Sequence, residues 1–235
     1  MNWIGFYDFK PSVIYVSARH RDAHYRTVAK DIRDLVPSPS AHVLDYGCGE
    51  ATSAALIAQA CGRLTMVEAA PTMRAALKAR YETSPKITVL TPDEAAAQAP
   101  HSFDLIVLHS VAQYLSSAEL DALLASFHRL LKPDGVFVLG DVVPPRFAAA
   151  LAALALLRFG AANGFLLAAA GGLIRILLSD YLRLKSTVGL SHYEEAAMLA
   201  KLKAAGFEPE RATHNIGHNQ RRMTFLSRAR VTKNP

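Results

Sequence analysis

Apolar side chains recur at two spacings along the first 143 residues, one helical and one extended. Between Tyr25 and Val36 they recur every three to four positions, which predicts an amphipathic helix that Pro37 and Pro39 then end. Short runs rich in β-branched residues predict buried strands at 42–47, 63–69, 86–90, 103–110 and 135–143. Helical segments are predicted between them at 52–61, 71–81 and 116–135. This alternation predicts a parallel sheet.

The alternation stops after Val143. Residues 146–185 are dominated by Ala, Leu, Phe and Gly, and an amphipathic helix returns at 192–206. Two closely spaced strands, 207–216 and 221–230, flank a turn and predict an antiparallel edge strand. We therefore predict an α/β fold: a doubly wound, Rossmann-like, mostly parallel seven-stranded sheet with helices on both faces and an apolar helical lid after strand five. Within one domain we distinguish an N-terminal helical cap (1–36), a core (40–143), the lid insertion (144–190) and a C-terminal part (191–235).

Composition narrows the class of protein. The 235 residues are 51% hydrophobic, which is enough to bury a full core. Two cysteines, Cys48 and Cys61, are too few for a disulfide framework, and no basic region precedes an apolar run at the N-terminus, so we expect a cytoplasmic protein. The net charge of +6 comes from residues 181–235, which hold 10 Lys/Arg against 4 Asp/Glu. This basic end could bind an acidic partner such as RNA or anionic lipid, or it could be a solvated edge strand that its charge protects from aggregation.

The motif VLDYGCGEA, residues 43–51, indicates a ligand site. Gly47 and Gly49 follow the first strand, at the loop where doubly wound sheets bind ligands, and let the backbone turn tightly. Glu68 ends the second strand, where an acidic residue can accept hydrogen bonds from both ribose hydroxyls. Asp45 would repel a pyrophosphate but favours a cationic ligand with sulfonium and ammonium groups. Because Ala51 also stands where a third glycine is expected, the pattern argues against NAD.

These residues resemble the motifs of the class I S-adenosylmethionine-dependent methyltransferases. The first motif is matched from Val43 to Gly49, with Tyr46 in place of the usual small or aliphatic residue, and further motifs are matched at 65–77, 90–115 and 130–142. The resemblance implies S-adenosylmethionine as cofactor, with Glu68 on the ribose, Met73 near the adenine and Asp93 near its amino group. The cofactor-binding residues that it implies are Asp45, Tyr46, Gly47, Cys48, Gly49, Glu68, Ala69, Met73, Asp93, Glu94 and His109.

Three residues near the expected methyl donor are candidates for catalysis. His109 ends the fourth strand and is a candidate general base or orienting group. The alternative is a structural histidine whose hydrogen bonds are all made at the end of the strand. Tyr114 lines the acceptor pocket or packs under the next helix. Asp141 ends the fifth strand as a catalytic or a turn-forming carboxylate. His24 and Tyr25 lie on the leading helix, which often closes over the cofactor in this family. No metal site is expected, since His214 and His218 share no helical face.

The apolar insertion bears on the acceptor. Its longest uncharged stretch, 159–174, is shorter than the ~20 residues of a membrane-spanning helix. Arg158 and Arg175 bound that stretch. The two favoured interpretations are paired helices in a bilayer interface, and a lid packed on its own domain or on a second subunit; a membrane-spanning segment is the third and least favoured.

We expect a methyltransferase that acts on a small, hydrophobic or lipid-like acceptor. The alternatives are an RNA methyltransferase that uses the basic C-terminus, and a non-catalytic protein that binds the cofactor or a membrane. No RNA-binding module is visible, so nucleic acid is not the expected partner. Attachment to the inner face of the membrane and a homodimer remain open.

Overall fold

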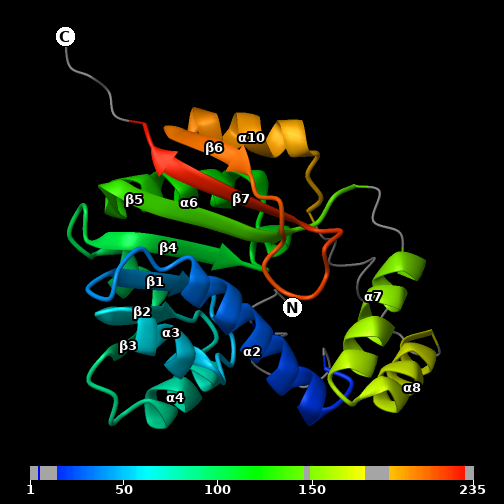
Figure 1. Cartoon of the computed structure of the whole chain (residues 1–235). Coiled ribbons are helices and arrows are strands. Elements are labelled where there is room, and N and C mark those ends of the chain that lie inside the picture. Colours follow the sequence, from blue (N-terminus) through cyan, green and yellow to red (C-terminus); the bar gives the residue numbers. More distant parts are fainter. Residues whose placement is uncertain (1–4, 6–14, 146–148, 178–190, 231–235) are drawn as a thin grey trace.

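Seven strands form one sheet in the order β3-β2-β1-β4-β5-β7-β6 (Figure 1). The computed structural model describes residues 5, 15–145, 149–177 and 191–230. Strands β1 to β5 run parallel, and β7 is antiparallel to both β5 and β6. This confirms the predicted doubly wound, mostly parallel fold. The strands are β1 (His42–Tyr46), β2 (Arg63–Val67), β3 (Ile87–Leu90), β4 (Phe103–His109), β5 (Leu131–Val142), β6 (Phe207–Arg211) and β7 (Met223–Ala229).

The closely spaced C-terminal strands form the antiparallel edge of the sheet, as predicted, because the edge strand β6 pairs antiparallel with β7. β7 lies between β5 and β6, with Leu139 opposite Phe225, and β6 forms the edge. The side chain of Phe225 is fully buried, whereas Glu208 and Glu210 of β6 are exposed. The more apolar strand therefore takes the interior position, and the charged strand protects the edge.

Helices cover both faces of the sheet (Figure 1). Leu124 and Phe127 of α6 and Leu202 of α10 belong to the core cluster on one face. Ile32 of α2 and Ile57 of α3 belong to the cluster on the other. The helices are α2 (Ala18–Asp34), α3 (Ala54–Ala60), α4 (Pro71–Arg80), α5 (Pro92–Ala96), α6 (Ser117–Leu130), α7 (Ala149–Ala162), α8 (Leu166–Leu177) and α10 (Glu195–Ala204), with a 3-10 turn, η2 (Ala112–Tyr114).

Local interactions explain where two helices begin and end. α2 begins at Ala18, before the predicted Tyr25, because the side chain of Ser17 accepts a hydrogen bond from the N–H of His20. α6 begins with a capping box between Ser116 and Glu119. It ends at Leu130, earlier than predicted, because Leu131 already pairs with Phe103 as the start of β5.

The predicted lid contains a helical hairpin, α7 and α8, beside the N-terminal end of α2 (Figure 1). The Arg19 guanidinium donates to the Gly164 carbonyl in the hairpin turn at 3.0 Å. A Cβ on Gly172 would lie 2.2 Å from Cγ2 of Val16, so glycine allows the close contact between α8 and the segment before α2. Residues 146–148 and 178–190 of the predicted lid lie outside the described residues. Among the helices that are described, none has the length and apolar character needed to cross a bilayer.

Candidate active site

The glycine-rich loop between β1 and α3 lies at the carboxyl end of the sheet. Gly47 and Gly49 have φ of +75° and +61°, where residues with a Cβ are strained. A Cβ on Gly47 would lie 2.4 Å from Cγ2 of Val111, and one on Gly49 would lie 2.6 Å from the Tyr25 hydroxyl. Both conformation and space therefore require glycine at these two positions.

Glu68 joins this loop to the loop after β2. One carboxylate oxygen accepts from the Gly49 N–H at 3.0 Å, and the other accepts from the Ala70 N–H at 2.8 Å. Burial raises the pKa of Glu68, although these N–H groups and Arg74 oppose the rise. Each oxygen keeps a further lone pair for a ligand donor.

Asp45 is a buried carboxylate with 7% of its surface exposed. Burial and the nearby charge of Glu68 raise its pKa to about 7. Across the described part of the chain, no hydrogen bond or ion pair reaches its carboxylate. A buried acid without a countercharge is costly, which makes this a fitting place for a cationic ligand.

Helix α2 covers the loop with aromatic side chains. The Tyr25 hydroxyl accepts from the Glu50 N–H at 2.8 Å and hydrogen bonds with the hydroxyl of Tyr15. A cavity of about 40 Å³ lies between α2 and the loop, lined by His24, Asp45 and His109 among others. The structure thus brings His24 and Tyr25 to the glycine loop, as the resemblance implies for the leading helix.

His109 ends β4 within reach of this cavity. Its Nε2 lies 3.3 Å from the carbonyl oxygen of Ile216, which can only accept a hydrogen bond, so Nε2 carries the proton of the neutral ring. Burial lowers the pKa of His109 despite the opposing charge of Asp141. The ring centre of His24 is 6.3 Å away. His109 is therefore neutral at pH 7, with Nδ1 as its unprotonated nitrogen.

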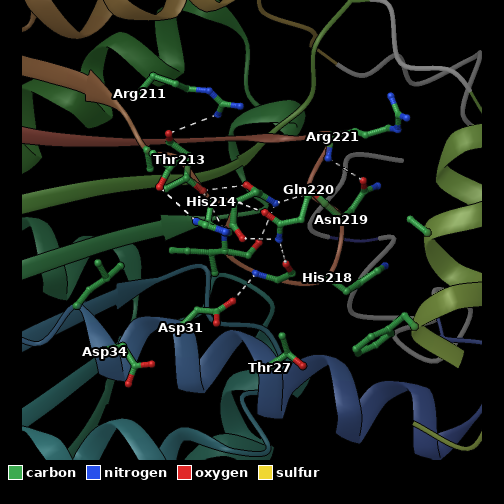
Figure 2. A pocket seen from close by; sticks show the side chains of 18 of the residues that line it. Thr27, Asp31, Asp34, Arg211, Thr213, His214, His218, Asn219, Gln220 and Arg221 are labelled. Carbon is green, nitrogen blue, oxygen red and sulfur yellow. Dashed lines mark hydrogen bonds between the residues drawn. The ribbon is translucent and has the colours of Figure 1, made fainter. Parts of the chain in front are cut away.

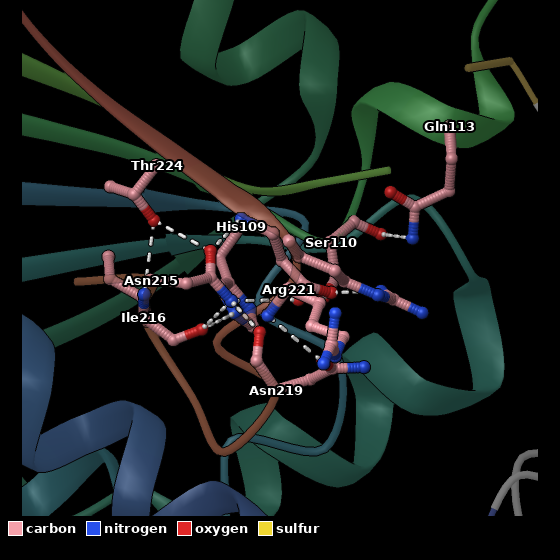
Figure 3. Close-up of polar contacts among 10 residues, drawn as sticks. His109, Ser110, Gln113, Asn215, Ile216, Asn219, Arg221 and Thr224 are labelled. Carbon is pink, nitrogen blue, oxygen red and sulfur yellow. Dashed lines mark hydrogen bonds and ion pairs between the residues drawn. The ribbon is translucent and has the colours of Figure 1, made fainter. Parts of the chain in front are cut away.

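Asp141 is the centre of a polar network, two members of which, Ser110 and Asn215, are labelled in Figure 3. Its carboxylate accepts from the Ser110 hydroxyl, from the Arg222 guanidinium and from the Asn215 amide, the last at 3.2 Å. Burial alone would raise its pKa, but Arg222 and His109 lower it below the ordinary value. Ser110 and Asp141 have φ of +57° and +64°, so this network holds two strained residues at the ends of β4 and β5.

The other predicted residues surround the loop less closely. Tyr46 packs edge-on against Phe127 at 5.2 Å between ring centres, and Tyr114 is half-buried on η2. Met73 is buried in the first turn of α4. Asp93 is exposed at the start of α5, where the Glu94 carboxylate accepts from the Thr91 N–H in a capping box. Burial raises the pKa of the Cys48 thiol, and Ala69 lies half-buried next to Glu68.

A cluster of histidine and aromatic rings was not predicted. His218 stacks on Phe159 of α7 at 4.4 Å, and His20 stacks on Phe165 at 5.0 Å. The ring centre of His218 is 6.3 Å from that of His20 and 6.2 Å from that of His24. The spacing of His20 and His24 places both on one helix face and was the available signal. No group of three potential metal ligands occurs among the residues that the structure describes.

Two members of this cluster, Phe159 and His218, also line a groove of about 950 Å³ (Figure 2), whereas His24 lines the small cavity. Helix α2 forms one side of the groove with Thr27 and Asp31, and the turn between β6 and β7 forms another. Leu151, Leu154 and Phe159 of α7 supply an apolar wall. The Asp31 carboxylate accepts from the Gly217 N–H at 2.7 Å, which fixes the turn on α2.

Comparisons with known proteins match this architecture. A family model described as "Methyltransferase domain" matches residues 43–135. An uncharacterized methyltransferase of Synechocystis sp. is 26% identical over 114 residues, which are 48% of this chain and 53% of that protein. The chain spans about half the length of the curated relatives it matches.

Solved structures show the same fold. Phosphoethanolamine N-methyltransferase 1 of Haemonchus contortus, in complex with phosphoethanolamine and S-adenosylhomocysteine, has a TM-score of 0.64 at 16% identity, covering 99% of this chain and 49% of that one. Magnesium protoporphyrin IX methyltransferase from Synechocystis, with bound S-adenosylmethionine, has a TM-score of 0.60 at 17% identity, covering 97% and 92%.

Proposed function

We propose that this chain, which belongs to the class I S-adenosylmethionine-dependent methyltransferases, transfers a methyl group from S-adenosylmethionine to a small hydrophobic or lipid-like acceptor. The observation that carries the cofactor assignment is the pair of buried carboxylates, Asp45 and Glu68. Asp45 lacks a countercharge within the described chain, and its pKa of about 7 reflects that cost. The sulfonium and ammonium groups of S-adenosylmethionine would supply the missing positive charge.

The residues at the loop fit that cofactor. Gly47 and Gly49 keep the backbone free of side chains where the ligand approaches, and the free lone pairs of Glu68 suit the two ribose hydroxyls. By the resemblance of the motifs, Met73 would contact the adenine and Asp93 would lie near its amino group. Tyr46, Cys48, Ala69 and Glu94 are proposed as further cofactor-binding residues on the same ground. When bound, the cofactor supplies an electrophilic methyl group on a positively charged sulfur.

His109 is proposed as the general base. Its Nε2–H is fixed by the Ile216 carbonyl, so Nδ1 is free to accept a proton from an acceptor O–H or N–H group. Cδ2 of His109 lies 3.1 Å from the Cβ position of Gly140, and Nδ1 is on the opposite edge of the ring. Asp141, whose carboxylate is occupied by Arg222, Ser110 and Asn215, acts as a positioning residue that holds the turn containing Ile216. Tyr114 is proposed to line the acceptor side.

The groove supports an apolar acceptor of small to moderate size. Leu151, Leu154 and Phe159 offer apolar surface. His218 also lines the groove, stacks on Phe159, and lies edge-on to His24 with 6.2 Å between ring centres. A groove of about 950 Å³ is large enough for a molecule with an extended apolar part. The RNA alternative has less support, because Arg222 pairs with Asp141 and Arg211 lies 3.7 Å from Glu195.

Calorimetry and a methyl-transfer assay test the two parts separately. We expect heat with S-adenosylmethionine and S-adenosylhomocysteine, a loss of it in Asp45→Asn, and no loss in the exposed control Asp134→Asn. Heat with NAD and none with either sulfur nucleoside would overturn the cofactor assignment. Labelled donor should be turned over with lipids or quinone precursors. Turnover confined to polar metabolites or RNA would overturn the acceptor class.

A further inference from the structure

All large hydrophobic side chains that are exposed in the described structure lie on the α7–α8 hairpin. They are Leu154, Leu166, Leu167 and Ile174, with Leu167 89% and Ile174 59% exposed. Leu167, Gly171 and Ile174 follow one another at intervals of four and three residues, which places them on one face of α8. None of the residues that the structure describes lies within 4 Å of the Cβ position of Gly171, so within that part of the chain this face is open. A patch of this kind marks an interaction site.

The charge of the hairpin restricts the partner. Residues 142–179 contain no Asp or Glu, and their charged residues are Arg146, Arg158 and Arg175. Arg175 is exposed immediately after Ile174, and Arg158 is exposed on α7. An apolar helix face beside arginines, without any acidic residue, is complementary to a bilayer that carries anionic headgroups. A soluble acidic protein would match the charge but not the leucine and isoleucine side chains.

The opposite side of the hairpin is fixed to the rest of the protein. Phe165 is buried and stacks on His20, and Gly160 and Ala169 pack where the two helices cross. Phe159 reaches the groove and stacks on His218. The same two helices therefore present an apolar face outward and form the apolar wall of the groove inward.

We propose that the outer face of the α7–α8 hairpin, with Leu167, Ile174 and Arg175, docks on a bilayer that contains anionic phospholipid. Docked in this way, the hairpin places the groove next to the membrane surface, so that an apolar acceptor enters from the lipid phase. The second statement rests on the proposed function, and the docking itself does not. The helices lie along the interface, with apolar side chains below the headgroups and arginine side chains reaching up to phosphate.

Flotation of the full chain with vesicles tests the docking. The protein should float with phosphatidylcholine vesicles that contain phosphatidylglycerol and stay at the bottom with phosphatidylcholine alone. Leu167→Asp/Ile174→Asp should abolish flotation, whereas Ala75→Asp/Ala79→Asp on the exposed side of α4 adds the same charge and should float. Arg175→Glu should weaken binding at least about fivefold, since one basic residue near the surface contributes about 1 kcal/mol. Lys78→Glu on α4 is its matched control.

Calorimetry with S-adenosylhomocysteine separates this proposal from the proposed function. An unchanged binding heat in Leu167→Asp/Ile174→Asp shows that the variant is folded, so its loss of flotation supports docking. Flotation that persists in that variant overturns the proposal, as does a wild type that binds neither vesicle. A dimer in light scattering that the variant converts to monomer, without vesicle binding, would instead assign this face to a second copy of the chain and overturn membrane docking.

Discussion

The ion pair between Arg222 and Asp141 ties the turn between β6 and β7 to the carboxyl end of β5. The Asn215 amide donates to the same carboxylate, and the Asp141 N–H donates back to the Asn215 side-chain oxygen at 3.1 Å. This exchange fixes the backbone around Ile216, whose carbonyl holds the ring of His109. The position of the proposed base therefore depends on an ion pair that does not touch it.

Removing the carboxylate should destabilise the protein and misplace His109. We expect Asp141→Ala to cost about 3 kcal/mol of unfolding free energy, because it leaves the Arg222 charge without its partner. The lowered pKa of Asp141 means that its contribution is present above pH 4 and is lost as the pH falls further. Urea unfolding at pH 7 and at pH 3 measures both effects, and Asp134→Ala is the exposed control. If Asp141→Ala lowered the free energy of unfolding equally at the two pH values, the ion-pair account would be contradicted.

Asp45 should oppose folding and favour cofactor binding at the same pH. Its pKa is raised to about 7, so its penalty is absent at pH 4 and grows as the pH rises to 7. Asp45→Asn should stabilise the ligand-free protein by about 2 kcal/mol at pH 8, a part of the penalty that the shift implies. It should also weaken S-adenosylmethionine binding. Thermal unfolding and calorimetry on one preparation test both effects. An Asp45→Asn variant that is less stable than the wild type and binds S-adenosylmethionine equally tightly would refute this account.

The sequence predicts the features that depend on residues close to one another in the chain. The apolar runs place β1 to β4 and all but the first residues of β5, and the pattern Thr91 to Glu94 is a capping box that can be read directly. The network around Asp141 is different, because Arg222 is 81 residues away and pairs with it only once β7 lies beside β5. The stack of His218 on Phe159 likewise joins the turn between β6 and β7 to helix α7, two segments that no local sequence pattern connects.

Replacing the proposed base should lower kcat without changing cofactor affinity. His109→Asn removes Nδ1 as a proton acceptor and should reduce kcat by about 10² to 10⁴ for an acceptor that must lose a proton. Burial lowers the pKa of His109, so the acid limb of wild-type activity should lie below the ordinary histidine value of about 6.5, and this limb should vanish in the variant. His192→Asn on the surface is the control. A structural role alone would change S-adenosylhomocysteine binding or Tm and leave the pH profile in place.

A double-mutant cycle can test whether a side chain at position 47 would clash with Val111. Gly47→Ala places a Cβ 2.4 Å from Cγ2 of Val111 at a φ of +75°. We expect a cost of about 3 kcal/mol, of which the backbone accounts for about 1 to 2 kcal/mol. Val111→Ala removes the clashing methyl group, so the double variant should recover the remainder, as a negative coupling in the unfolding free energy. Additive effects would show that the two side chains do not meet.

Acid should loosen the contact between α2 and the hairpin through buried histidines. Burial lowers the pKa of His20 to about 4 and that of His24 to about 3, with His218 and His109 adding to the effect and Asp141 opposing it at His24. Neutral rings are therefore preferred in the folded state, and stability is lost as the pH falls from about 6.5 toward those values. His24→Leu removes one titrating group and should flatten the fall of Tm between pH 6.5 and 4. His192→Leu, at an exposed histidine, should leave the slope unchanged, and an equal slope in both variants would exclude His24 as its source.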